Sequence, residues 1–268
     1  MQFLLCASSA DNPFGFVSIL FFIILKNFYH KKDVDNIYFI AAFKEAMGLI
    51  ISLQPELYGT IFLSLRVTFT ALFFAALIGI PLGVLLGLYK FAGKKILVNI
   101  INTFMSVPPV VVGLIVYMLL SNETGLVGDN RLLFTPFAMI LAQFALALPL
   151  MVGLTYAGIS NVDPLAKRSA ISLGASPTGV AFTVIREARF VIYSSFIVVF
   201  GRLLAEVGAV MMVGGNIRYQ TRMMTTSIAM LKGMGEFQTA LALGMILLLI
   251  SFVINGLMEV IRNYGRNN

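Results

Sequence analysis

The chain has few of the side chains that could build a metal centre or a catalytic cluster. Its 268 residues include one cysteine, Cys6, and one histidine, His30. A single cysteine excludes an internal disulfide framework and a thiolate metal cluster. His30 stands beside Lys31 and Lys32 and is interpreted as a solvated side chain, because metal and catalytic sites need several convergent groups. We therefore predict no catalytic residue, no metal site and no cofactor bound by this chain.

Charge is also scarce, and this scarcity indicates the class of protein. Charged residues make up 12% of the chain, hydrophobic residues make up 59%, and the mean hydropathy is +0.93. This composition is typical of an integral membrane protein built from α-helices. The formal net charge of +7 does not indicate nucleic acid as a partner, because the basic residues flank apolar runs in the way that sets membrane topology.

Apolar runs define the expected membrane helices. A helix that crosses about 30 Å of hydrocarbon needs about 20 mostly apolar residues. Windows that meet this length are residues 67–88, 96–120, 132–159, 190–213 and 237–258. Prolines in the first three windows, Pro81, Pro108–Pro109 and Pro149, predict kinks, which either shape helix packing or open a transport route. We expect one membrane domain, 47–268, built from five core helices.

The segment 1–46 is predicted to be a dispensable N-terminal extension. Its apolar run, 14–25, has 12 residues and is short for a membrane span even when it is extended to Tyr29. If this run crosses the membrane, it adds a sixth helix. Met47 begins a stretch that is typical of the start of a protein chain.

The loops between the windows differ in basic residues. Nine Lys or Arg residues follow the first, third and fifth windows, and four follow the second and fourth. Cytoplasmic loops collect Lys and Arg. We therefore expect the loop 163–189 and the C-terminus to be cytoplasmic.

The loop 163–189 contains the start and stop signals of two short helices. Asp163 precedes Pro164, and Ser176 precedes Pro177, which is the arrangement of a helix N-cap followed by proline at the first helical position. Gly174 suits the left-handed residue that ends the first helix. The resulting helix–turn–helix either serves only to connect two spans or is bound by a partner protein. A DNA-binding role is excluded by its attachment to membrane spans at both ends.

This loop also carries a family resemblance. Its sequence RSAISLGASPTGVAFTVI resembles the EAA loop of ABC-importer permeases, with Arg168-Ser169-Ala170 where Glu-Ala-Ala stands, the pair Gly174–Ala175, and an apolar tail. In that family the loop is the coupling helix that docks on the ATP-hydrolysing subunit. The residues that the resemblance assigns to ATPase coupling are Arg168, Ala170, Gly174, Ala175, Ser176, Pro177 and Phe182.

The fourth window contains two charged residues. Arg202 and Glu206 are four residues apart, so in a continuous helix they would lie on one face and form an ion pair. The pair either fixes helix packing or faces a water-filled route. Asn216, which follows the window, either caps a helix end or offers an amide to an anion. These three residues are the candidates for a translocation path.

The segment GRLLAEVGAVMMVGGNIRYQTRMMTTSIAM, residues 201–230, sharpens the resemblance. It resembles the molybdate and tungstate permeases, and the tungstate type most. This resemblance, which covers about 47–262, implies the type I importer fold in the cell membrane of a prokaryote. It implies a homodimer of this permease on two ABC ATPase subunits, served by an extracytoplasmic oxyanion-binding protein.

The resemblance makes the chain a transport subunit rather than an enzyme. A P-loop needs the pattern G-x4-GK-[ST], and the nearest approach, Gly87 to Lys95, fails in its spacing and its final residue. ATP would therefore be hydrolysed by the partner ATPase. Molybdate, and more distantly sulfate or phosphate, stay open as substrates. An ATP-independent channel or secondary transporter is the alternative of another class, and it would show inverted repeats.

Overall fold

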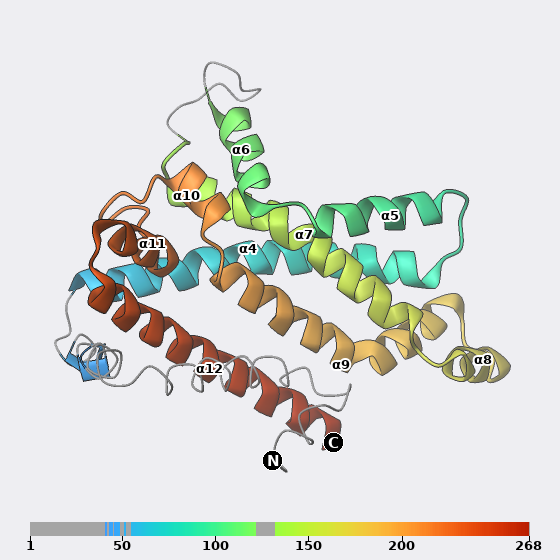
Figure 1. The fold of residues 1–268 in the computed structure, drawn as a ribbon. Helices are drawn as coiled ribbons and strands as arrows, with labels where there is room; N and C mark the ends of the chain where they lie inside the picture. Colours follow the sequence, from blue (N-terminus) through green and yellow to red (C-terminus); the bar gives the residue numbers. More distant parts are fainter. Residues whose placement is uncertain are drawn as a thin grey trace, which may run out of the picture.

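The computed structural model describes residues 55–121 and 132–267 and a few positions between 41 and 51, and the regular elements within them are α-helices. They are α4 (Pro55–Leu88), α5 (Lys94–Met105), α6 (Pro109–Leu120), α7 (Pro136–Ser160), α8 (Pro164–Ser172), α9 (Pro177–Leu204), α10 (Gly208–Gly214), α11 (Met224–Met234) and α12 (Phe237–Asn267) (Figure 1). The predicted all-α fold is confirmed. The predicted extension 1–46 lies, apart from a few positions, outside the described residues.

Three of these helices are long and apolar enough to cross a membrane, namely α4, α7 and α12. The number rises to five if each of two bent helix pairs counts as one span. The bent pairs, α5 with α6 and α9 with α10, occupy the windows 96–120 and 190–213. Each of these windows still forms one span if its bent pair is counted together, as the prediction of five core helices requires. A kink was predicted at Pro108–Pro109, whereas the break after Leu204 was not predicted.

The bend between α5 and α6 has a local cause. The two axes differ by 96°, and the break falls at Pro108–Pro109. Neither proline has a backbone N–H, and Pro108 adopts an extended conformation before Pro109 starts α6. As a result α5 runs along the bundle while α6 turns away from it (Figure 1). Pro81 and Pro149, in contrast, lie inside the uninterrupted helices α4 and α7.

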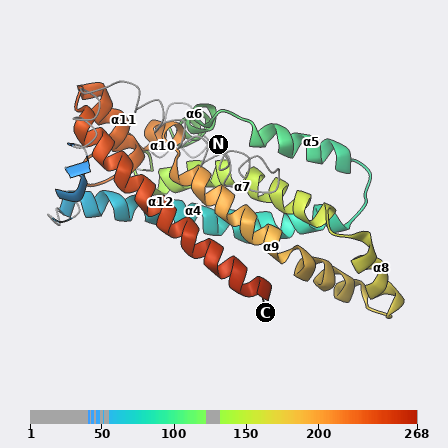
Figure 2. The same ribbon diagram turned by 60° about the horizontal axis from the view of Figure 1, so that its bottom comes forward.

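The bundle has two distinct ends. Helix α8 lies at one end, and α11 lies at the other in both views (Figures 1 and 2). The turn between α4 and α5 is on the same side as α8, and α10 is on the same side as α11. We refer to these as the α8 end and the α11 end.

A ridge of glycines packs α4 against α7. Gly79, Gly83 and Gly87 recur every four residues and therefore lie on one face of α4. A Cβ built at Gly79 or Gly83 would approach side-chain atoms of α7 to 2.9 or 2.6 Å, and one built at Gly87 would come closer still to Ile159. Such contacts are too short for any side chain larger than hydrogen. The two backbones therefore approach as closely as small-residue ridges allow in membranes.

This packing predicts the effect of adding one methyl group. Replacing Gly83 with Ala would force apart α4 and α7, at a cost of about 1–3 kcal/mol. We expect G83A to lower the midpoint of thermal unfolding of the detergent-solubilised protein by several degrees. Gly59, in the same helix, has nothing within 4 Å of a built Cβ, so G59A is the matched control and should unfold no earlier than wild type. Equal midpoints for the two variants would contradict the tight packing.

Candidate functional site

The loop 163–189 folds as two helices, and the predicted caps are confirmed. The Asp163 carboxylate accepts a hydrogen bond from the Leu165 backbone N–H at 2.8 Å at the start of α8. The Ser176 hydroxyl accepts one from the Gly179 backbone N–H at 3.2 Å at the start of α9. These bonds satisfy N–H groups that have no partner in the first turn of a helix. The connection between the two helices is therefore fixed by the chain itself.

The turn between α8 and α9 is a Schellman motif. The Gly174 N–H bonds to the Ile171 carbonyl and the Ala175 N–H bonds to the Ala170 carbonyl, each at 3.0 Å. Gly174 has φ 76°, the left-handed conformation that the motif requires. The prediction of a left-handed glycine at this position is confirmed.

Exposed apolar side chains lie at and beside the turn, and the resemblance assigned only some of them. Leu173 is 87% exposed and Phe182 is 68% exposed. Ala170, at 7% exposure, is the buried member of the predicted coupling set. Other exposed apolar residues of α8, which the sequence pattern did not single out, are Leu165 and Ile171. Because exposed apolar side chains in a polar loop mark contact sites, this surface is suited to a protein partner.

The predicted ion pair between Arg202 and Glu206 is absent from the described structure. Helix α9 ends at Leu204, and the chain turns by 55° before α10 begins at Gly208. The prediction assumed a continuous helix and is wrong for this reason. Arg202 is exposed, whereas Glu206 is only 7% exposed.

The break is stabilised by polar groups from three parts of the chain. The Glu206 carboxylate accepts a hydrogen bond from the Ala209 N–H at 3.0 Å and so caps α10. The Gln143 side chain on α7 donates to the Leu203 carbonyl at 3.2 Å, and the Thr225 hydroxyl on α11 donates to the Glu206 carbonyl at 2.9 Å. Sequence reasoning missed Gln143 and Thr225, although a lone glutamine inside an apolar window is a usable signal.

Asn216 holds a turn within the chain. It has φ 52°, its side-chain oxygen accepts a hydrogen bond from the Thr226 hydroxyl at 2.9 Å, and its amide nitrogen lies 3.3 Å from the Met230 sulfur. Both ends of the amide are therefore engaged by α11. Within the described residues the amide bonds to side chains of α11 and not to the backbone of a helix end, and the contact of Asn216 with an anion stays a prediction.

Two arginines of the α10–α11 connection converge on one carboxylate. The Arg218 guanidinium donates to both Glu56 oxygens, with 2.7 Å between Nε and Oε1, and Arg222 approaches the same carboxylate at 3.4 Å. The hydrogen bonds that Arg218 donates to Glu56 raise the pKa of the Arg218 guanidinium. This cluster ties the connection to the first turn of α4, at the α11 end.

Arg66 is a further cation that sequence reasoning placed outside a span. Helix α4 begins at Pro55, twelve residues before the predicted window, so Arg66 lies well inside it and is exposed. The rings of Phe69 on α4 and Phe200 on α9 lie 4.9 Å apart. This contact brings the part of α4 that carries Arg66 to the part of α9 that carries Arg202.

Comparison with known sequences identifies the family of the chain. The chain matches the model of the family described as the binding-protein-dependent transport system inner membrane component over residues 79–263. It is 44% identical over 218 residues to the tungstate uptake system permease protein of Peptoclostridium acidaminophilum, with 81% of this chain and 95% of that protein covered. It is 39% identical to the protein of the same name from Campylobacter jejuni, with 81% and 91% covered.

Comparison with solved structures confirms the fold. The chain superposes on the membrane subunit of a bacterial alginate ABC transporter, crystallised in complex with a periplasmic protein bound to alginate pentasaccharide, with a TM-score of 0.65. That match has 19% sequence identity and covers 91% of this chain and 93% of the other. The fold is thus the membrane domain of a type I ABC importer, as the sequence resemblance implied, and it defines a multi-pass membrane protein. The chain belongs to the family of binding-protein-dependent transport system inner membrane components.

The break between α9 and α10 predicts how Glu206 variants behave. Replacing Glu206 with Ala removes the cap of α10 and should lower the free energy of unfolding by about 0.5–2 kcal/mol. Because Arg202 forms no pair with Glu206, adding Arg202→Leu should not restore the loss. Thermal unfolding of the purified variants measures both effects, and Glu236→Ala, which removes an exposed carboxylate, is the control. Rescue of E206A by R202L would show that the two charges interact after all.

Proposed function

We propose that this chain is the permease subunit of an ATP-driven importer of tungstate. The observation that carries the proposal is its 44% identity, over most of its length, to a tungstate uptake permease. The fold supports the transport role, because two of its helix pairs are bent within apolar stretches. Such broken helices are tolerated in membranes where they line a protein-enclosed or water-filled route.

The thermodynamics of a dianion requires an energy source. Moving one elementary charge against 100 mV costs about 2.3 kcal/mol, so a tungstate dianion entering a cell that is negative inside costs roughly 4.6 kcal/mol. Uptake from a scarce supply adds a concentration term. We assign ATP hydrolysis to a partner ATPase, and delivery of tungstate to an extracytoplasmic binding protein.

The α8 end is the surface that we assign to the ATPase. The turn is rigid, because both helix caps and the Schellman motif are formed within the chain. It projects from the bundle, and Leu173 and Phe182 are exposed on it. A rigid apolar projection of this kind can insert into a groove on the ATPase. It can then transmit movement of the ATPase to α9, since α9 begins at the turn and continues into the bundle. This assignment places the α8 end in the cytoplasm.

The route for the anion is proposed to lie between two copies of the chain. Val198, Arg202 and Ala205 are exposed and share one side of the end of α9. An arginine that faces lipid at this depth is costly, so such residues normally face protein or water. A second copy on this face would place Arg202, with Arg66 of α4, beside the path. Two cations from each copy would give the path the positive field that a dianion needs.

Uptake by the reconstituted transporter tests the proposed function. Proteoliposomes that contain the permease, its ATPase and its binding protein should accumulate tungstate when ATP is supplied, in the presence of equimolar molybdate. Arg202→Gln should lower the rate roughly tenfold, since one charge in a low-dielectric path contributes more than about 1 kcal/mol. Lys232→Gln, at an exposed cation of α11, should leave the rate unchanged. Uptake without ATP would indicate a channel, and preferential accumulation of molybdate would overturn the choice of substrate.

A second experiment tests the coupling role of the α8 end. Valine at Gly174 is incompatible with φ 76° and should distort the turn, so that transport-stimulated ATP hydrolysis by the reconstituted complex is lost. Gly235 has φ 84° and, like Gly174, has nothing within 4 Å of a built Cβ, but it lies at the α11 end. G235V therefore imposes the same backbone strain elsewhere and should retain coupling. Normal stimulation in G174V, or equal loss in both variants, would contradict the assignment.

A further inference from the structure

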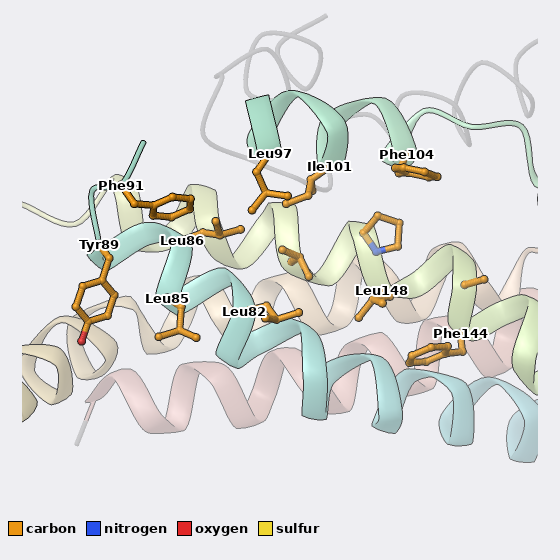
Figure 3. A pocket seen from close by; sticks show the side chains of 13 residues that line it. Leu82, Leu85, Leu86, Tyr89, Phe91, Leu97, Ile101, Phe104, Phe144 and Leu148 are labelled. Atoms are coloured by element: carbon orange, nitrogen blue, oxygen red, sulfur yellow. The ribbon is translucent and has the colours of Figure 1, made fainter. Parts of the chain in front are cut away.

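An apolar cavity opens between α5 and the pair α4–α7. Its volume is about 770 Å³, and Figure 3 shows the side chains of the three elements turned toward it. Leu82 and Leu85 belong to α4, Ile101 and Phe104 to α5, and Leu148 to α7. The volume lies within the range of ligand sites, which is roughly 300–1,000 Å³. The lining is almost wholly hydrocarbon, so a polar solute or a free phosphate would find no partner inside.

The cavity exists because α5 is attached to the bundle near its C-terminal end. There the Met105 sulfur occupies the space left by Gly153 on α7, where a Cβ would otherwise stand. No residue of α5 is buried, and Ile96 at its other end is 68% exposed. The N-terminal part of α5 thus lies over a gap that the protein itself leaves unfilled.

Three lysines lie in the chain segment that forms one end of this cavity, which we call its mouth. Lys90 stands between the lining residues Tyr89 and Phe91, and Lys94 and Lys95 begin α5. Lys94 is held in place, since its ammonium donates to the Tyr89 carbonyl at 3.2 Å and lies 5.2 Å from the centre of the Tyr156 ring. Lys90 and Lys95 are exposed and form no ion pair within the described part of the chain.

No acidic residue offsets these three cations on the elements that form the cavity. Residues 57–121 and 136–160 contain no Asp or Glu. The one carboxylate of α4, Glu56, lies at the opposite end of that helix and is engaged by Arg218. The mouth of the cavity therefore attracts an anion, while its interior accepts only an apolar group.

We propose that this cavity binds one anionic phospholipid, with an acyl chain between α5 and α4–α7 and the headgroup phosphate at Lys90 and Lys95. Basic residues at the edge of a pocket between membrane helices recognise such headgroups. Helix α5 rises about 14 Å from Lys95 to Phe104, which matches the roughly 15 Å that one leaflet of hydrocarbon spans. A second copy of the chain could cover the apolar wall instead, and it would then exclude lipid from the cavity.

The absence of tryptophan from the sequence gives a direct test. Phe104→Trp places a single fluorophore in the cavity, and Phe252→Trp places one on α12, where the side chain is 78% exposed. Each full-length variant is reconstituted in phosphatidylcholine vesicles. An equal fraction of the lipid is then replaced by phosphatidylcholine or phosphatidylglycerol with brominated acyl chains, which quench nearby tryptophan on contact.

We expect brominated phosphatidylglycerol to quench the fluorescence of F104W more strongly than brominated phosphatidylcholine does, with a relative affinity that is roughly fivefold higher for each lysine at the mouth. Lys90→Gln with Lys95→Gln should remove this preference, and the α12 probe should show none. Equal quenching of F104W by both lipids, or a preference that survives the double lysine variant, would overturn the proposal. Quenching of the α12 probe without quenching of F104W would also overturn it, because protein would then fill the cavity.

Discussion

A helix that breaks inside a membrane releases backbone groups that lipid cannot satisfy, and the region between α9 and α10 is organised by this constraint. The Leu203 and Glu206 carbonyls accept hydrogen bonds from Gln143 of α7 and Thr225 of α11, and the Glu206 carboxylate accepts one from the Ala209 N–H in the first turn of α10. Three helices must therefore be in register before the break is stable. The same bonds that permit the bend also fix how α7, α9 and α11 lie against one another.

The parts of the structure that the sequence predicted are those governed by local bonds. The caps of α8 and α9 and the left-handed Gly174 involve groups within five residues of one another, so their signals stand side by side in the chain. The bend at Pro108–Pro109 was visible for the same reason, since proline lacks the N–H that continues a helix. The size of this bend, 96°, depends on how the helices pack, and the local sequence does not predict it.

The parts that the sequence did not predict depend on distant partners. The break after Leu204 has no proline, and the following segment is apolar enough to pass for the second half of one helix, so Arg202 and Glu206 were wrongly paired. Glu56 and Arg218 are 162 residues apart, and Gln143 is 60 residues from its partner Leu203. Such contacts form only when the bundle is assembled. A single sequence shows that a polar residue stands in an apolar segment, but it does not show which distant residue is its partner.

The glycine ridge of α4 has a mechanical consequence. Contacts between Gly79, Gly83 and Gly87 and the side chains of α7 leave no slack for the two helices to slide or tilt relative to each other. Helices α4 and α7 therefore form one rigid unit. In the proposed transport cycle, deformation is therefore expected to concentrate at the two existing bends, between α5 and α6 and between α9 and α10, while α4 and α7 move together as one rigid unit.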